Sequence, residues 1–138
     1  MGSRVNAAMV RWAPVIAWMA VIFSLSAQPG LRITENDGWD FVLRKIGHAI
    51  VYGVLAVLVL RALPRSIQIP GAVLFVLAFA VSDELHQTIV RDRSGSLRDI
   101  AIDLAGAFVA MTLWAWIARD RDRPPKLAST PAGSSPPR

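Results

Sequence analysis

The sequence contains no cysteine, and only two histidines and one tyrosine among its 138 residues. The absence of cysteine excludes disulfide bonds, thiolate metal ligands and cysteine nucleophiles. Charged residues are also scarce, at 18%, whereas 54% of the residues are apolar and the mean hydropathy is +0.43. A chain of this length has little interior in which to bury so much apolar surface. Because a lipid-facing exterior removes this difficulty, the composition favours a membrane protein over a small soluble domain.

The formal net charge is +5 and the pI is near 11.0. The basic residues lie at the ends of apolar segments, and they do not gather on one helix with interleaved aromatic residues. This distribution is typical of residues that orient a membrane protein, not of a nucleic-acid interface. We therefore expect no nucleic-acid partner.

Four apolar stretches are long enough to cross a hydrocarbon core as helices, which takes roughly 17–25 residues. They are 9–27, 41–63, 70–90 and 97–118. The alternative for the first stretch is a cleaved signal peptide, but its 19 residues exceed the ~7–15 of a signal core and favour a retained helix. The sequence therefore predicts an all-α fold, a four-helix transmembrane bundle over residues 9–118.

The segments outside these stretches have the composition of loops. Residues 28–40 include Pro29, Gly30, Asn36 and Gly38, which predict an exposed loop, and residues 92–96 predict a turn. Residues 119–138 are basic and then rich in proline and serine, which predicts a disordered cytoplasmic tail.

The distribution of charge predicts how the bundle is oriented. With the N-terminus in the cytoplasm, nine of the 15 basic residues lie in cytoplasmic segments and six lie on the opposite side. This bias places both termini of a multi-pass membrane protein in the cytoplasm. Eight of the 10 acidic residues then lie on the outer side.

Polar side chains within the apolar stretches are costly in lipid, so their common location needs an explanation. His48, Asp83 and Asp103 each lie six or seven residues from the outer end of their stretch, which is about 10 Å below the surface in a helix. This agreement predicts an outward-facing polar pocket between helices. The candidate binding residues are Lys45, His48, Tyr52, Asp83, Glu84, Gln87, Arg93, Ser96, Asp99 and Asp103.

Helical spacing groups these residues further. Lys45, His48 and Tyr52 share one face of the second helix. On the fourth helix, Asp99 and Asp103 continue into Gly106 and Ala110, small residues that allow another helix to approach closely. Ser96 is expected to cap this helix, with Asp99 three residues later in the position of a capping box.

Three alternatives remain open for this polar set. The charged residues could form only structural ion pairs that fix how the helices pack. His48, Glu84, Asp99 and Asp103 have side chains of the types that bind zinc, manganese or magnesium, but no metal-binding motif is present, and we expect no cofactor. His48 could also exchange protons with Glu84 or Asp99, because an imidazole suits acid–base chemistry near neutral pH. No catalytic residue is assigned.

Three sequence blocks point to a known family. They are Lys45-x-x-His48-x-x-x-Tyr52-x-x-Leu55-Ala56, Ser82-Asp83-Glu84-x-x-Gln87, and Arg93-Ser-Gly-Ser96-x-x-Asp99-x-x-x-Asp103-x-x-Gly106. In order and spacing they resemble the VanZ-like family of small bacterial membrane proteins, over residues 24–118 and including a Ser-x-x-Pro stretch that begins at Ser26. Where that family often has Pro-Gly-Arg before the third block, this chain has Arg91-Asp92-Arg93.

The resemblance implies a function only in outline. The namesake of the family is associated with low-level resistance to the glycopeptide teicoplanin, without an established reaction. Some members have been labelled phosphotransbutyrylases, and nothing in this chain supports that soluble chemistry. We expect a cell-envelope protein whose pocket binds the polar headgroup of a membrane lipid or lipid-linked wall precursor, with Lys45 and Arg93 holding anionic groups. An enzyme that modifies such a headgroup and a structural or assembly factor are the alternatives.

Overall fold

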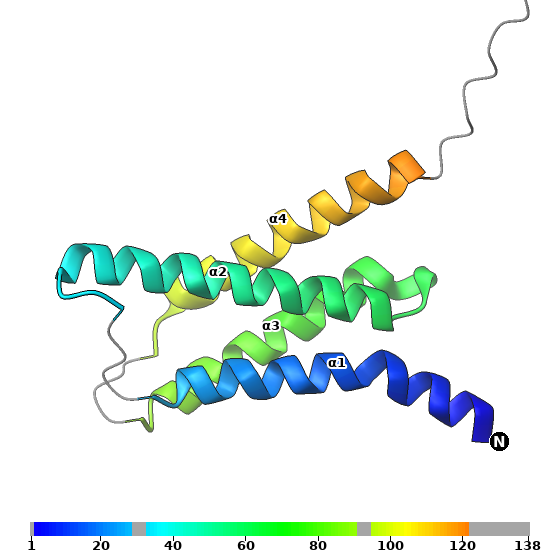
Figure 1. The fold of residues 1–138 in the computed structure, drawn as a ribbon, viewed down its shortest axis with the longest axis horizontal. Helices are drawn as coiled ribbons and strands as arrows, with labels where there is room; N and C mark the ends of the chain where they lie inside the picture. Colours follow the sequence, from blue (N-terminus) through cyan, green and yellow to red (C-terminus); the bar gives the residue numbers. More distant parts are fainter. Residues whose placement is uncertain (1, 29–32, 91–94, 122–138) are drawn as a thin grey trace, which may run out of the picture.

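The computed structural model describes residues 2–28, 33–90 and 95–121, and the predicted site residue Arg93 and nearly all of the predicted tail lie outside them. All regular secondary structure of the described residues is helical (Figure 1). Its elements are α1 (Gly2–Ser26), α2 (Asp37–Ala62), the short 3-10 helix η1 (Arg65–Ile67), α3 (Gln68–Gln87) and α4 (Leu97–Arg121). Within this part of the chain, four helices are long and apolar enough to cross a membrane, as predicted.

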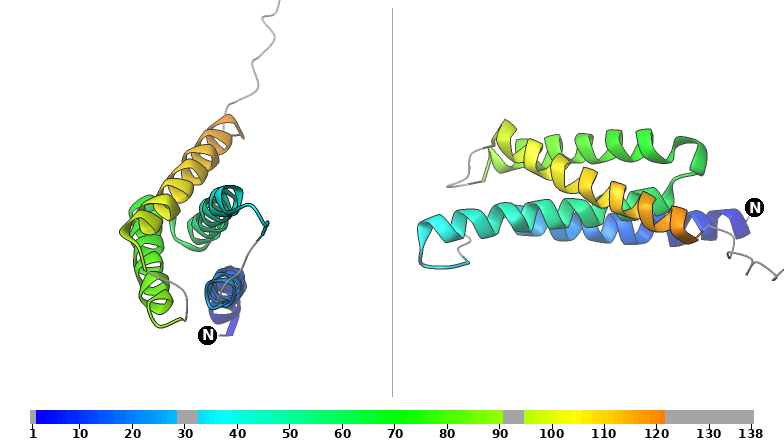
Figure 2. Two further views of the ribbon diagram at one scale, coloured as in Figure 1. Left: turned by 90° about the vertical axis from the view of Figure 1, so that its left-hand side faces the viewer. Right: turned by 90° about the horizontal axis from the view of Figure 1, so that it is seen from above.

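The four helices run broadly along the long axis of the molecule, with α4 inclined to α1 and α2, and α2 contacts each of the other three (Figures 1 and 2). The ends of α1 and α3 and the beginnings of α2 and α4 gather at one end of the molecule, which we call the loop end. The N-terminus, the turn between α2 and α3, and the end of α4 lie at the other end. Helices α2 and α4 therefore run in the same direction, and α4 packs most extensively against α2.

Helix α2 begins earlier than the sequence predicts. Asn36 is its N-cap, and the side-chain Oδ1 of Asn36 accepts hydrogen bonds of 3.1 Å from the backbone amides of Gly38 and Trp39. The prediction of an exposed loop over residues 28–40 is thus wrong for 37–40. Asparagine favours both loops and helix N-caps, and here the capping role applies. At the other boundaries, α1 starts before residue 9, α3 ends at Gln87 instead of 90, and α4 extends to Arg121.

The hydrophobic core is small and centres on α2. Its buried residues include Tyr52, Leu55 and Val59 of α2, Val76 of α3 and Met111 of α4. Many large apolar side chains lie on the outside of the bundle, including those of Ile16, Ile50, Leu74, Phe108 and Trp116. Several polar side chains are buried instead, namely those of Ser26, Asp40, Asp83, Glu84, Gln87 and Asp103. An apolar exterior around a polar interior fits helices surrounded by lipid.

Helices α2 and α4 approach each other at glycines. A Cβ atom added to Gly106 would lie only 2.1 Å from the carbonyl oxygen of Ala49, and one added to Gly53 would lie 3.2 Å from the carbonyl oxygen of Gly106. Only glycine allows the backbones to come this close. The small residues of α4 thus do what their spacing predicts, and they do it just below Asp99 and Asp103.

Candidate functional site

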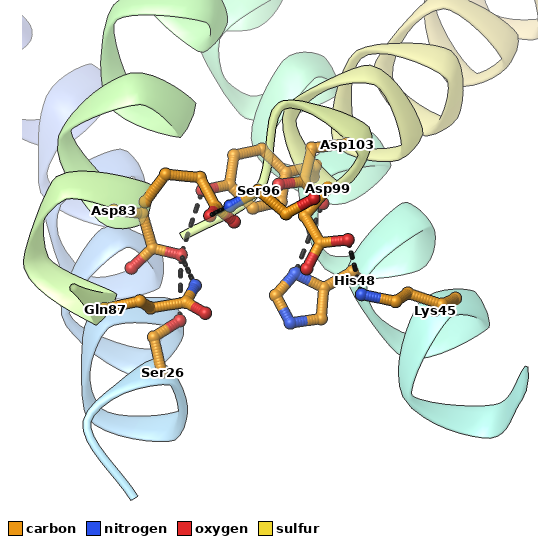
Figure 3. Close-up of polar contacts among 10 residues, drawn as sticks. Ser26, Lys45, His48, Asp83, Gln87, Ser96, Asp99 and Asp103 are labelled. Carbon is orange, nitrogen blue, oxygen red and sulfur yellow. Dashed lines mark hydrogen bonds and ion pairs between the residues drawn. The ribbon is translucent and has the colours of Figure 1, made fainter. Parts of the chain in front are cut away.

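Figure 3 shows that most of the described site residues predicted from sequence gather in one polar cluster. Lys45, His48 and Tyr52 come from α2, and Asp83, Glu84 and Gln87 from the last turns of α3. Asp99 and Asp103 lie in the first turns of α4, and Ser96 precedes it. The convergence predicted from residue depth is therefore confirmed, because side chains of three helices contact one another here. Their depth in a bilayer and their binding role stay predictions.

Asp83 is the centre of the first group of contacts. Its side chain is 0% exposed, and its Oδ2 atom accepts hydrogen bonds from Ser26 Oγ at 2.8 Å, Gln87 Nε2 at 3.2 Å and Tyr52 OH at 3.3 Å. These donors belong to α1, α3 and α2, respectively. One buried carboxylate oxygen thus connects three helices at the loop end.

A second group of contacts joins α2 to α4. The ammonium group of Lys45 forms an ion pair with Asp99, and Nδ1 of His48 lies 3.3 Å from Oδ1 of Asp103. The two pairs occur in the same order along helices that run in the same direction, one turn apart on each helix. The structure therefore pairs His48 with Asp103, and not with Glu84 or Asp99.

Glu84 contacts the beginning of α4. Its Oε2 atom accepts a 2.6 Å hydrogen bond from the backbone amide of Ser96, and Ser96 Oγ accepts one of 3.2 Å from the amide of Arg98. Ser96 thus caps α4 as predicted, but the carboxylate in the capping-box role comes from Glu84 on α3 instead of Asp99. Because Glu84 satisfies this amide, Asp99 is available to pair with Lys45.

Three carboxylate oxygens of the cluster are buried and lack a hydrogen-bond partner among the described residues. They are Oδ1 of Asp83, Oε1 of Glu84 and Oδ2 of Asp103. Buried acceptors are normally paired, so unpaired ones are unusual and point to a functional region.

Within residues 2–28, 33–90 and 95–121, no group of three or more histidine or acidic side chains is arranged to hold a metal ion. The four metal candidates instead lie in three separate contacts, His48–Asp103, Lys45–Asp99 and Glu84–Ser96.

A cavity of about 250 Å³ lies between α1 and α2 beside this cluster. We call it the α1–α2 cavity. Its polar lining residues are Ser26, Arg44 and His48, and its other lining residues are Ile22, Leu25, Ile33, Gly47 and Val51. Sequence reasoning did not select Ser26 or Arg44 as site residues. The only signal for Ser26 was its position in the Ser-x-x-Pro stretch, and no pattern in the sequence separated Arg44 from Lys45.

Each polar residue of the α1–α2 cavity contacts a buried carboxylate. Ser26 Oγ donates to Asp83, and His48 Nδ1 faces Asp103, as described above. Nε of Arg44 lies 2.9 Å from Oδ2 of Asp40, whose side chain is 4% exposed. A carboxylate that contacts one atom of a polar side chain holds that side chain in a fixed orientation. The atoms of the side chain that face the cavity are then also fixed before a ligand binds.

Comparison with known proteins identifies the family. The family model described as VanZ/LLP1 matches residues 11–118, which is most of the chain and includes all three sequence blocks. The chain belongs to the VanZ/LLP1 family. The resemblance inferred from the motifs is thereby confirmed, and together with the four apolar helices it indicates a multi-pass membrane protein. Neither the curated proteins nor the solved structures gave a match.

Proposed function

We propose that this VanZ/LLP1 protein is a cell-envelope protein of the bacterial cytoplasmic membrane that binds the polar headgroup of a lipid or lipid-linked wall precursor. The observation that carries this proposal is the α1–α2 cavity, where three polar residues are each fixed by a buried carboxylate. Side chains held in place before binding lose little entropy when a ligand arrives, so such a site favours recognition.

The lining of the cavity suits an amphipathic ligand. Ile22, Leu25 and Val51 provide apolar surface beside the polar Ser26 and His48. A lipid near the membrane surface has the same division between its headgroup and the first carbons of its chains. The loop end would face outward, because the excess of basic residues lies in the segments at the other end.

The roles of the cations follow from their surroundings. Lys45 is paired with Asp99 and is absent from the cavity lining, whereas Arg44 is part of it. We therefore assign the anion-holding role to Arg44 in place of Lys45, and Arg93 keeps its predicted role. The link to glycopeptide tolerance of the teicoplanin type rests on family membership, and it would follow if the bound headgroup belongs to a wall precursor.

The experiment is to fill the cavity without disturbing the polar contacts. A Cβ atom at Gly47 would have no neighbour within 4 Å, so Gly47→Leu places its side chain in open cavity space. Ala78→Leu adds the same bulk at an exposed position of α3 and is the matched control. We expect Gly47→Leu, but not Ala78→Leu, to lose lipid detected by native mass spectrometry of protein released from nanodiscs, and to lose glycopeptide tolerance in cells. Retention of the lipid by folded Gly47→Leu would overturn the proposal.

A second candidate, an enzyme acting on the headgroup, is favoured by one observation. His48 and Ser26 line the same cavity, and each is hydrogen-bonded to a buried aspartate. A histidine oriented by a carboxylate is suited to proton transfer. This candidate requires a chemically altered lipid after incubation with a panel of precursors, and loss of that product in His48→Gln. If conservative changes in the cluster lower only the amount of folded protein, the structural or assembly role is the correct one.

A further inference from the structure

The hydrogen-bonding capacity of the α1–α2 cavity specifies its ligand more narrowly. Ser26 uses its hydroxyl proton in the bond to Asp83, so its oxygen offers a ligand only lone pairs. Nδ1 of His48 faces a carboxylate of Asp103, which accepts and does not donate, so the proton of a neutral ring lies on Nδ1. The lone pair of Nε2 is then available. Two of the three polar lining residues are therefore acceptors for a ligand hydroxyl.

Arg44 has the opposite character. A guanidinium group has five N–H donors and no acceptor, and the described contact with Asp40 involves Nε. The remaining donors form a planar fork that matches two oxygens of a phosphate. The side chain is 41% exposed, so the fork is accessible to a ligand. In a membrane, the anion that most headgroups provide is a phosphate.

The size of the cavity limits how much of a lipid it holds. At about 250 Å³ it is slightly smaller than the roughly 300–1,000 Å³ of sites for drug-sized molecules. It therefore fits a phosphate with a small attached group, and it is too small for a complete lipid. The apolar lining residues Ile22, Leu25 and Val51 would contact the carbons that adjoin the phosphate.

We infer that the ligand is a lipid phosphate ester that has a hydroxyl group close to the phosphate, with the phosphate on Arg44 and the hydroxyl donating its one proton to His48 Nε2, beside Ser26 Oγ. This inference rests on the proposed headgroup-binding function and adds the chemical class of the headgroup. Two sources share this chemistry, the glycerol phosphate of phosphatidylglycerol and a sugar joined through phosphate to a polyprenyl lipid. An ammonium group can also donate to these acceptors, so an ammonium lipid is the competitor in the experiment.

The test compares lipids that differ only in the hydroxyl groups. The full chain is placed in nanodiscs with equal amounts of phosphatidylglycerol and phosphatidylpropanol, which carry the same charge, and bound lipid is measured by native mass spectrometry. We expect phosphatidylglycerol to be preferred by about tenfold, the effect of one hydrogen bond to a buried partner. A parallel pair, polyprenyl phosphate with and without an attached sugar, shows which source binds more tightly. Phosphatidylethanolamine is the ammonium competitor.

Two variants should affect binding in different ways. His48→Phe removes the acceptor, so we expect the preference for phosphatidylglycerol to fall to about onefold while phosphate binding persists. Arg44→Gln removes the phosphate fork, so binding of both lipids should fall together by about tenfold with the preference kept. Arg65→Gln, an exposed cation of η1, is the control and should change neither. The preference is a ratio measured on folded protein, so a reduced yield of a variant does not alter it.

The outcomes separate this inference from the proposed function. Equal binding of phosphatidylglycerol and phosphatidylpropanol that Gly47→Leu abolishes would overturn the inference and leave headgroup binding in place. Stronger binding of phosphatidylethanolamine would also overturn it. If no lipid is retained above the level of Gly47→Leu, the proposed function itself fails.

Discussion

Replacing Gly106 with alanine should separate α2 from α4 and break the polar pairs between them. The added Cβ atom would lie 2.1 Å from the carbonyl oxygen of Ala49 and 2.6 Å from its carbonyl carbon and Cα. Ordinary contact begins at 3.4 Å, so the two backbones must move apart by about 1.3 Å. The obstructing atoms are backbone atoms, and no change of side-chain rotamer can relieve the overlap.

The energetic cost combines overpacking with lost polar contacts. Overpacking a core costs about 1–3 kcal/mol. Since His48 and Asp103 are already 3.3 Å apart, the same movement takes them beyond hydrogen-bond distance, and a charge-assisted bond contributes about 1.5–3 kcal/mol. Alanine itself favours a helix over glycine by roughly 0.5–1 kcal/mol. We therefore expect Gly106→Ala to lower the free energy of unfolding by at least about 2 kcal/mol relative to a glycine-to-alanine change without a clash.

Gly47→Ala is that matched comparison. It makes the same change within a helix, but its Cβ atom has no neighbour within 4 Å. Unfolding of both variants can be followed by circular dichroism and tryptophan fluorescence as SDS is added to dodecylmaltoside micelles. If the two variants unfold at free energies within about 0.5 kcal/mol of each other, the close approach of α2 and α4 would be refuted.

Three further predictions concern the polar cluster and its orientation. Glu84→Ala removes the acceptor of the amide at the start of α4 and should cost about 1–3 kcal/mol in the same unfolding assay, whereas Glu84→Gln, which keeps an acceptor oxygen, should cost less. Lys45→Ala and Asp99→Ala should be non-additive by about 0.5–3 kcal/mol in a double-mutant cycle, and additive free energies would show that the ion pair contributes nothing. Because the chain lacks cysteine, single cysteines at Arg65 and Arg93 report sidedness directly: an impermeant thiol reagent added to intact spheroplasts should label only position 93, and the reverse pattern would place the loop end in the cytoplasm.

Depth and helical face were sufficient to predict which residues of the site meet. His48 and Asp103 belong to different helices, and their similar distances from the outer ends of the predicted stretches placed them at the same level, although α2 itself begins four residues before its stretch. The pairing between individual residues could not be predicted in the same way. Lys45 had several carboxylates within reach, and the choice of Asp99 depends on α4 lying beside α2 and on Glu84 occupying the amide of Ser96.

The α1–α2 cavity was not predictable because it results from packing and not from a motif. Arg44, Gly47, His48 and Val51 form one stripe of α2, and only the packing of α1 beside that stripe leaves a cavity where Gly47 contributes no side chain. Asn36 illustrates a local ambiguity of a different kind. Asparagine is common both in loops and at helix N-caps. The hydrogen bonds that the Asn36 side chain accepts from two backbone amides show that it is a helix cap here.

The structural and binding interpretations of the cluster are not separate, because polar contacts determine where α1 lies. In lipid, apolar side chains gain little by moving from the acyl chains to another helix, so hydrogen bonds and close packing hold transmembrane helices together. Among the described residues, such bonds to α1 include those from Ser26 to Asp83 and from Trp18 Nε1 to the carbonyl oxygen of Val51 at 2.8 Å. Ser26 and Val51 both line the cavity. The buried carboxylate of Asp83 therefore shapes the cavity by positioning the helix that forms one wall of it, so a substitution there affects helix packing and ligand binding together.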